Sequence, residues 1–108
     1  MATQKETVDF ILDKLAPDGA FRVRAMFGEY ALYVGDRVVA LVCDNQLYVK
    51  IVPASESLAD RCERDAPYPG ARPHYLVEEH QLDQIKNLSA ILLDIADSLP
   101  EKKPKKKR

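Results

Sequence analysis

FRVRAMFGEYALYVGDRVVALVCDNQLYVKI, residues 21–51, holds four short apolar runs that are separated by Gly28, by Gly35-Asp36 and by Asp44-Asn45. Apolar and polar residues alternate in these runs, which predicts β-strands. We expect them to start at Phe21 and to cover residues 29–34, 37–43 and 46–51. Parallel strands would need crossovers of about a dozen residues or more. The stretch therefore predicts an antiparallel four-strand meander.

The two tightest connections have residues that suit hairpin turns. Gly35-Asp36 has glycine at the first central position, which is typical of a type II′ turn. Asp44 and Asn45 both tolerate a positive φ. Between these turns the strand RVVALVC is apolar on both faces, so we expect a central strand that is covered on both sides.

Segments with apolar residues at helical spacing flank the meander on both sides. Residues 4–15 form a predicted amphipathic helix, and Thr3 with Glu6 fits a capping box at its start. A long stripe predicts a final helix that ends at Pro100, and its members are Leu82, Ile85, Leu88, Ile91, Leu92, Ile95 and Leu99. Each such side chain contributes about 1.5–3 kcal/mol when buried. This helix should therefore be a principal part of the core.

The segment between the meander and the final helix has weaker signals. Pro53 opens a short, largely polar predicted helix that ends near Asp65, and residues 74–78 predict a fifth strand. The expected fold is α+β, in the order α-β-β-β-β-α-β-α, with both terminal helices on the sheet. The final stripe would also suit a coiled-coil seam, but packing on the protein's own sheet is favoured for a single helix of this length.

Composition and charge indicate one domain with a distinct tail. The chain has 108 residues, 46% of them hydrophobic, which is ordinary for a soluble globular domain. Residues 1–100 carry ten Lys/Arg against sixteen Asp/Glu, whereas residues 101–108 carry a net charge of +5. We expect residues 1–100 to form the domain and residues 101–108 to be a disordered basic tail. Without a signal peptide or membrane span, a cytoplasmic location is expected.

The tail is the predicted nucleic-acid contact, through Lys102, Lys103, Lys105, Lys106, Lys107 and Arg108. Clustered cations bind phosphates without reading base sequence. A solubilising terminus is the other interpretation, and in a eukaryotic sequence the run would resemble a nuclear-import signal. Arg22 and Arg24 form a basic strand face that would either extend this surface or be solvated.

Catalytic and metal-binding patterns do not emerge from the sequence. Glu78, Glu79 and His80 are adjacent and so cannot all face one ion from an extended segment. Cys43 and Cys62 are expected to be packed thiols rather than a redox or metal pair. We therefore expect no cofactor and no enzymatic activity.

The meander's residue identities carry a family resemblance. RAMFGEY at residues 24–30, LY at 32–33, VALV at 39–42 and DNQLYVK at 44–50 resemble the TfoX N-terminal domain (TfoX/Sxy-like). The resemblance continues through YPG at 68–70, HY at 74–75 and the final helix, and so spans nearly all of residues 3–99. Ala31 departs from the family, which often has glycine there. The resemblance implies an α+β domain with helices packed on an antiparallel sheet.

The resemblance also implies a link to bacterial competence and transcription regulators, which are thought to help a cyclic-AMP receptor protein act at promoters. Full regulators carry a second helical domain, so we expect a stand-alone form here. The expected function is a non-enzymatic regulatory or adaptor domain that contacts a transcription-regulator protein and touches DNA or RNA loosely through the tail. The expected partner surface comprises Arg24, Met26, Phe27, Gly28, Glu29 and Tyr30. The alternative is a protein-interaction or dimerisation module with no nucleic-acid role; a monomer or weak homodimer is expected.

Overall fold

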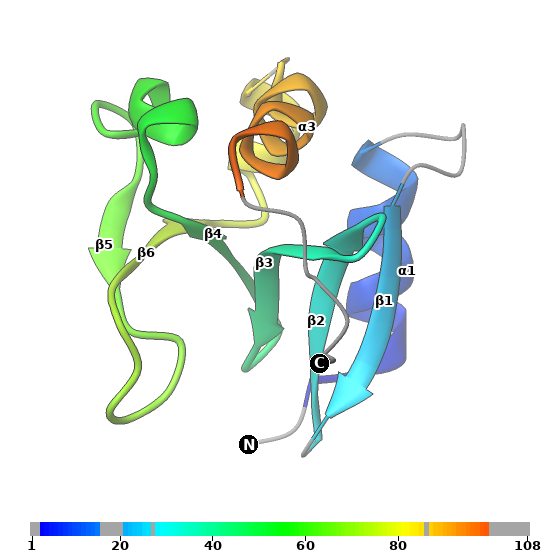
Figure 1. The fold of residues 1–108 in the computed structure, drawn as a ribbon. Helices are drawn as coiled ribbons and strands as arrows, with labels where there is room; N and C mark the ends of the chain where they lie inside the picture. The colour runs from blue at the N-terminus through cyan, green and yellow to red at the C-terminus, as the bar shows by residue number, and fades with distance from the viewer. Residues whose placement is uncertain (1–2, 16–20, 27, 86, 100–108) are drawn as a thin grey trace, which may run out of the picture.

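Six antiparallel strands form a single sheet in a computed structural model, which describes residues 3–15, 21–26, 28–85 and 87–99. The strand order is β1-β2-β3-β4-β6-β5 (Figure 1). The strands are β1 (Phe21–Met26), β2 (Glu29–Val34), β3 (Arg37–Cys43), β4 (Gln46–Lys50), β5 (Glu63–Asp65) and β6 (His74–Val77). The helices are α1 (Lys5–Leu15), the 3₁₀ helix η1 (Pro53–Leu58), α2 (Gln81–Gln84) and α3 (Leu88–Ser98). The predicted α+β class is confirmed.

The predicted meander is also confirmed, since β1 to β4 pair with their sequence neighbours in antiparallel register. Gly35 has φ +61°, and Asp44 and Asn45 have φ +53° and +62°, as their tight turns require. The β2–β3 register shifts after Leu32, so that Val39 is an extra residue on β3. This β-bulge places Val38 and Leu41 on one face of the sheet and Val42 on the other.

The helices of the described ranges all pack on one face of the sheet. α1 contributes Val8, Ile11 and Leu15 to the main core, and α3 contributes Ile91, Leu92 and Ile95 among others. α3 also contacts β2, β3 and η1. Figure 1 shows α3 above β3 and β4, and α1 alongside β1 and β2. The helical stripes found in the sequence are therefore the sides that bury against the sheet.

The opposite face of the sheet carries a second, smaller apolar cluster, and no helix of the described ranges packs on it. Its buried members are Ala31, Leu41, Cys43, Tyr48 and Leu76. Residues of β3 are buried on both faces, but the prediction that the strand is covered on both sides is wrong for this face, because the helices of the described ranges pack on the other one. We call this second surface the open face.

Three local predictions are wrong. Thr3 does not form a capping box with Glu6, because its hydroxyl donates to the distant carboxylate of Glu29. The second helix does not reach Asp65: it is the short η1, and residues 63–65 instead form the edge strand β5 beside β6. The fully buried Ser55 organises this segment, since its hydroxyl donates to the Lys50 carbonyl at 2.6 Å and accepts from the Val52 amide at 3.0 Å.

The third correction concerns the last helix, which is broken into α2 and α3. Ile85 has φ −91° and ψ 89°, and Asn87 has φ −103° and ψ 24°, so neither is helical. Ile85 is only 3% exposed. The break lets the chain turn while Leu82, Ile85 and Leu88 all stay buried in the main core. Periodicity alone does not reveal such a break, because the apolar spacing continues through it.

None of the helices in the described ranges is long and apolar enough to cross a membrane. Residues 101–108, the predicted tail, lie outside the part of the chain that the structure describes.

Candidate functional site

The motif at residues 28–29 holds the start of α1 against the sheet. Gly28 has φ +83°, and its carbonyl accepts a hydrogen bond from the Thr3 amide at 3.0 Å. The Glu29 carboxylate accepts the hydroxyl of Thr3 and the backbone N–H of Asp44, the latter at 3.1 Å. Thr3 is only 6% exposed, and its hydroxyl oxygen also accepts from the Asn45 amide at 3.2 Å. We call these contacts among residues 3, 28, 29, 44 and 45 the clamp.

Asn45 completes the clamp as the cap of α1. Its side-chain oxygen accepts the backbone N–H of Gln4 at 2.9 Å and the hydroxyl of Thr7 at 3.1 Å. The first N–H groups of a helix have no partner within the helix, so an oxygen at this position stabilises its N-terminus. Here the oxygen comes from the β3–β4 turn, 41 positions along the chain from Gln4.

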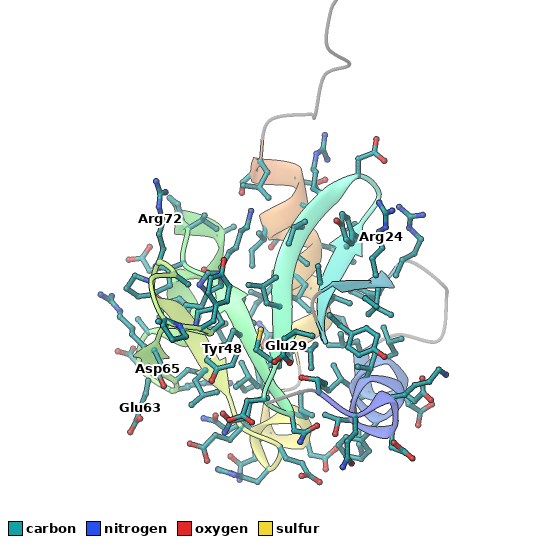
Figure 2. All side chains as sticks on the ribbon, turned by 90° about the horizontal axis from the view of Figure 1, so that it is seen from below. Arg24, Glu29, Tyr48, Glu63, Asp65 and Arg72 are labelled. Atoms are coloured by element: carbon teal, nitrogen blue, oxygen red, sulfur yellow. The ribbon has the colours of Figure 1, made fainter. Side chains whose placement is uncertain are left out.

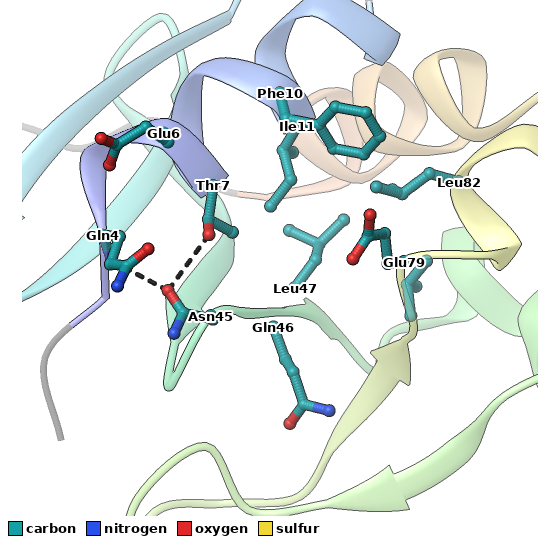
Figure 3. A pocket seen from close by; sticks show the side chains of 11 residues that line it. Gln4, Glu6, Thr7, Phe10, Ile11, Asn45, Gln46, Leu47, Glu79 and Leu82 are labelled. Atoms are coloured by element: carbon teal, nitrogen blue, oxygen red, sulfur yellow. Dashed lines mark hydrogen bonds between the residues drawn. The ribbon is translucent and has the colours of Figure 1, made fainter.

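Beside the clamp lies a groove with a volume of about 310 Å³. α1, the β3–β4 turn, β4 and the β6–α2 connection form its walls. Figure 3 shows Gln4, Thr7 and Asn45 on one side and Glu79 with Leu82 on the other, with Ile11 and Leu47 between them. The lining residues are Gln4, Glu6, Thr7, Phe10, Ile11, Asn45, Gln46, Leu47, Val77, Glu79 and Leu82.

The groove is apolar at its floor and acidic at its rim. Ile11, Leu47 and Leu82 belong to the buried core, whereas Phe10 is 38% exposed. Glu6 and Glu79 are exposed and form no ion pair with another described residue. Such a combination suits a ligand that presents a cation next to an apolar group.

A lysine lies near the groove but already forms an ion pair with a carboxylate outside it. The ammonium of Lys14 is 2.8 Å from a carboxylate oxygen of Asp83, and it lies 5.4 Å from the centre of the Phe10 ring. The hydrogen bond to Asp83 and the charge of that group raise the pKa of Lys14 above its usual value. Lys14 is therefore paired with Asp83, and among the described residues it forms no ion pair with Glu6 or Glu79.

The structure places the predicted partner surface in two different settings. Gly28 and Glu29 are part of the clamp, and Tyr30 is half-buried against the main core. Arg24 is exposed on the open face. The side chain of Met26 and the whole of Phe27 lie outside what the structure describes. The role of this stretch in partner binding stays a prediction, as does that of the tail cations.

The cysteines are both buried and unbonded to each other. Burial, followed by the charges of Glu29 and Asp44, raises the pKa of the Cys43 thiol to about 11. Burial likewise raises the pKa of Cys62. Thiols with raised pKa values are poor nucleophiles at neutral pH. Within the described ranges no three His, Cys, Asp or Glu side chains gather in a way that could hold a metal ion.

The groove was not predicted from the sequence, because the residues that line it carry only a weak local signal. Phe10 and Glu6 lie on α1, where Phe10 departs from the buried stripe. A single exposed aromatic residue is common on protein surfaces and does not by itself reveal a binding surface. The other wall, with Glu79 and Leu82, comes from the β6–α2 connection and α2, whose position beside α1 was not evident from local pattern.

Two comparisons with known proteins bear on identity. The family model described as "TfoX N-terminal domain" matches residues 13–93. A protein of Spirochaeta aurantia, described as an "Uncharacterized 12.7 kDa protein in trpE 5'region", is 35% identical over 106 residues, covering 98% of this chain and 91% of that protein. The family match supports a regulatory or adaptor-type domain. It includes all six strands and most of α3. The chain therefore belongs to the TfoX N-terminal domain family.

Proposed function

We propose that this domain is a non-enzymatic adaptor that holds a basic, partly apolar segment of a transcription-regulator protein in the groove beside α1. The observation that carries the proposal is the acidic rim of Glu6 and Glu79 over an apolar floor. A Lys or Arg side chain would meet the carboxylates, while a neighbouring apolar side chain would cover Ile11 and Leu47. The expected location is the cytoplasm, where such regulators act.

The clamp supports this proposal because it connects the family motif to the groove. Glu29 positions Thr3, and Asn45 binds both Gln4 and Thr7, which are lining residues of the groove. A partner site that is held by hydrogen bonds loses less conformational entropy when it binds. The motif would thus act on the partner indirectly, by fixing one wall of the groove.

The groove proposal is tested with a purified regulator of the cyclic-AMP receptor type from the same cell. Binding is measured by biolayer interferometry for the full chain and for Glu79→Lys. Reversing one rim charge should weaken binding by about tenfold, which corresponds to about 1.4 kcal/mol. The matched control is Asp97→Lys, which reverses an exposed carboxylate on α3 outside the groove.

The control variant should bind as the unaltered chain does. Equal affinity of all three proteins, or no binding by any of them, contradicts the proposal. Urea unfolding of each variant shows whether a loss of binding comes from a loss of fold.

A second part of the proposal is loose nucleic-acid contact by the tail, which rests on its six Lys/Arg residues. Binding to random duplex DNA is measured against salt for the full chain and for a chain with those six residues replaced by glutamine. Four to six phosphate contacts give a log–log slope of about −4 to −5. The glutamine chain should lose that slope, whereas equal affinity and slope in both chains would rule out the tail as a contact.

A further inference from the structure

One row of side chains crosses the whole open face. Neighbours in the strand registers have side chains on the same face, so the pairings connect one residue from each strand. In spatial order from β1 to β5 the row is Arg24, Ala31, Leu41, Tyr48, Leu76 and Glu63. Four of these residues belong to the apolar cluster of the open face, and the two end residues are oppositely charged.

The charges at the two edges form pairs of like sign. Arg22 and Arg24 alternate along β1, and Glu63 and Asp65 alternate along β5; all four are exposed. Figure 2 shows Arg24 on one side of this face and Glu63 with Asp65 on the opposite side, with Tyr48 between them. β1 therefore presents basic side chains at one edge of the open face, and β5 presents acidic side chains at the other. Lys50 and His74, which are in register with Asp65, and Arg72 lie on the same side as β5 (Figure 2).

These edges cannot neutralise each other within one chain. Arg24 and Glu63 are separated by five strand-to-strand steps, which at roughly 4.8 Å each is about 24 Å. Neither side chain has a hydrogen bond or an ion pair with another residue in the described ranges. Oppositely charged edges on one face are complementary to the same face of a second copy.

We propose that the open face binds a second copy of this chain in a two-fold dimer whose axis runs along the strands, between β3 and β4. Rotation about that axis reverses the row, so Arg24 of each copy faces Glu63 of the other. In the same arrangement the small Ala31 faces Leu76, and Leu41 faces Tyr48. A two-fold axis across the strands would instead place the basic edges together, which like charges disfavour.

The dimer should be reversible and sensitive to salt. Leu41 and Tyr48 are only 8% and 5% exposed in the single chain, so covering them removes little further apolar surface from water. The edges must then supply much of the specificity, and exposed charge pairs weaken as salt screens them. The low exposure of these apolar side chains agrees with a chain that is stable as a monomer and dimerises only at higher concentration.

Charge reversal tests the pairing directly. Arg24→Glu gives a chain that is acidic at both ends of the row, and Glu63→Arg gives one that is basic at both ends. Each variant alone has two repulsive contacts in the proposed dimer and should be monomeric in sedimentation velocity. An equimolar mixture restores both attractive contacts, so a heterodimer should form at least tenfold more tightly than either variant self-associates. Native mass spectrometry identifies it by mass.

The control is Asp97→Arg, an exposed charge reversal on α3, which should leave the dimer unchanged. A wild-type chain that stays monomeric to several hundred micromolar (weaker than about 5 kcal/mol of association) overturns the proposal. The proposal is also overturned by a dimer that persists in both charge-reversal variants. A loss of the dimer that mixing the two variants does not restore overturns it as well. Glu79→Lys lies on the helix side of the sheet and should not affect the dimer, so the adaptor proposal and this one fail separately.

Discussion

The clamp between Glu29 and Thr3 yields a quantitative prediction about stability. The two side chains come from β2 and from the residues before α1, and they share a hydrogen bond in a site where Thr3 is nearly buried. Glu29→Ala removes the acceptor of both the Thr3 hydroxyl and the Asp44 amide. Hydrogen bonds to a charged group contribute about 1.5–3 kcal/mol each, and the half-buried position of Glu29 lets water replace part of this. We expect a loss of about 2–3 kcal/mol.

Thr3→Val keeps the shape of the side chain and removes only its hydroxyl. Because the Asn45 amide also loses its acceptor, we expect a cost of about 1–2 kcal/mol. In the double variant the shared bond is lost once rather than twice. The two single losses should therefore exceed the loss in the double variant by about 1 kcal/mol or more.

Urea unfolding, followed by circular dichroism, measures all four free energies of unfolding. Native-state hydrogen exchange adds a local readout, since the amides of Thr7 and Val8 bond to the Gln4 carbonyl in the first turn of α1. These amides should exchange faster in either single variant. Losses that add within about 0.5 kcal/mol would show that the carboxylate and hydroxyl act independently, and would refute the clamp.

Two further predictions concern the turn and the strand next to it. Asn45→Gly keeps a backbone that accepts φ +62° but removes the side-chain oxygen that accepts from Gln4 and Thr7, which should cost about 1 kcal/mol in urea unfolding. Asn45→Ala should cost about 1 kcal/mol more because of strain at that φ, so equal losses would contradict this account. Burial raises the pKa of the Cys43 thiol from its ordinary value of 9.0 to about 11 in the folded chain. The unfolded chain therefore loses the thiol proton first, and stability falls as pH rises from about 9 to about 11. The free energy of unfolding should fall less in Cys43→Ala, by at most about 3 kcal/mol over that range. An equal decline in both proteins would argue against the raised pKa of Cys43.

The meander was predictable because its signals act between close neighbours. Alternation of apolar residues selects the strand faces, and Gly35, Asp44 and Asn45 mark turns whose backbone few other residues adopt. The clamp was not predictable in the same way. Thr3 and Glu6 have capping-box spacing, yet a carboxylate 26 positions away is the group that binds Thr3. Local sequence pattern gives no information on hydrogen-bond partners that the fold brings near from distant segments.

The site depends on such long-range contacts more than the fold does. The family motif was recognised at Gly28 and Glu29, but its internal role became visible only when Thr3 and Asn45 were placed beside it. The groove needs α1 next to the segment that contains Glu79. Similarly, Arg24 and Glu63 reach opposite ends of one row only because β6 lies between β4 and β5.

The amino-acid sequence by itself determined the strands of the meander, their antiparallel pairing, the apolar sides of α1 and α3, and the family. Each of these depends on residue spacing or identity over a few turns or strands. The tertiary structure alone decided the position of β5, the break at Ile85, the clamp, the groove and the charged edges of the open face. The physical reason is that these features arise where distant segments compete to bury apolar surface and to satisfy polar groups, and that competition is resolved only when the whole chain is packed.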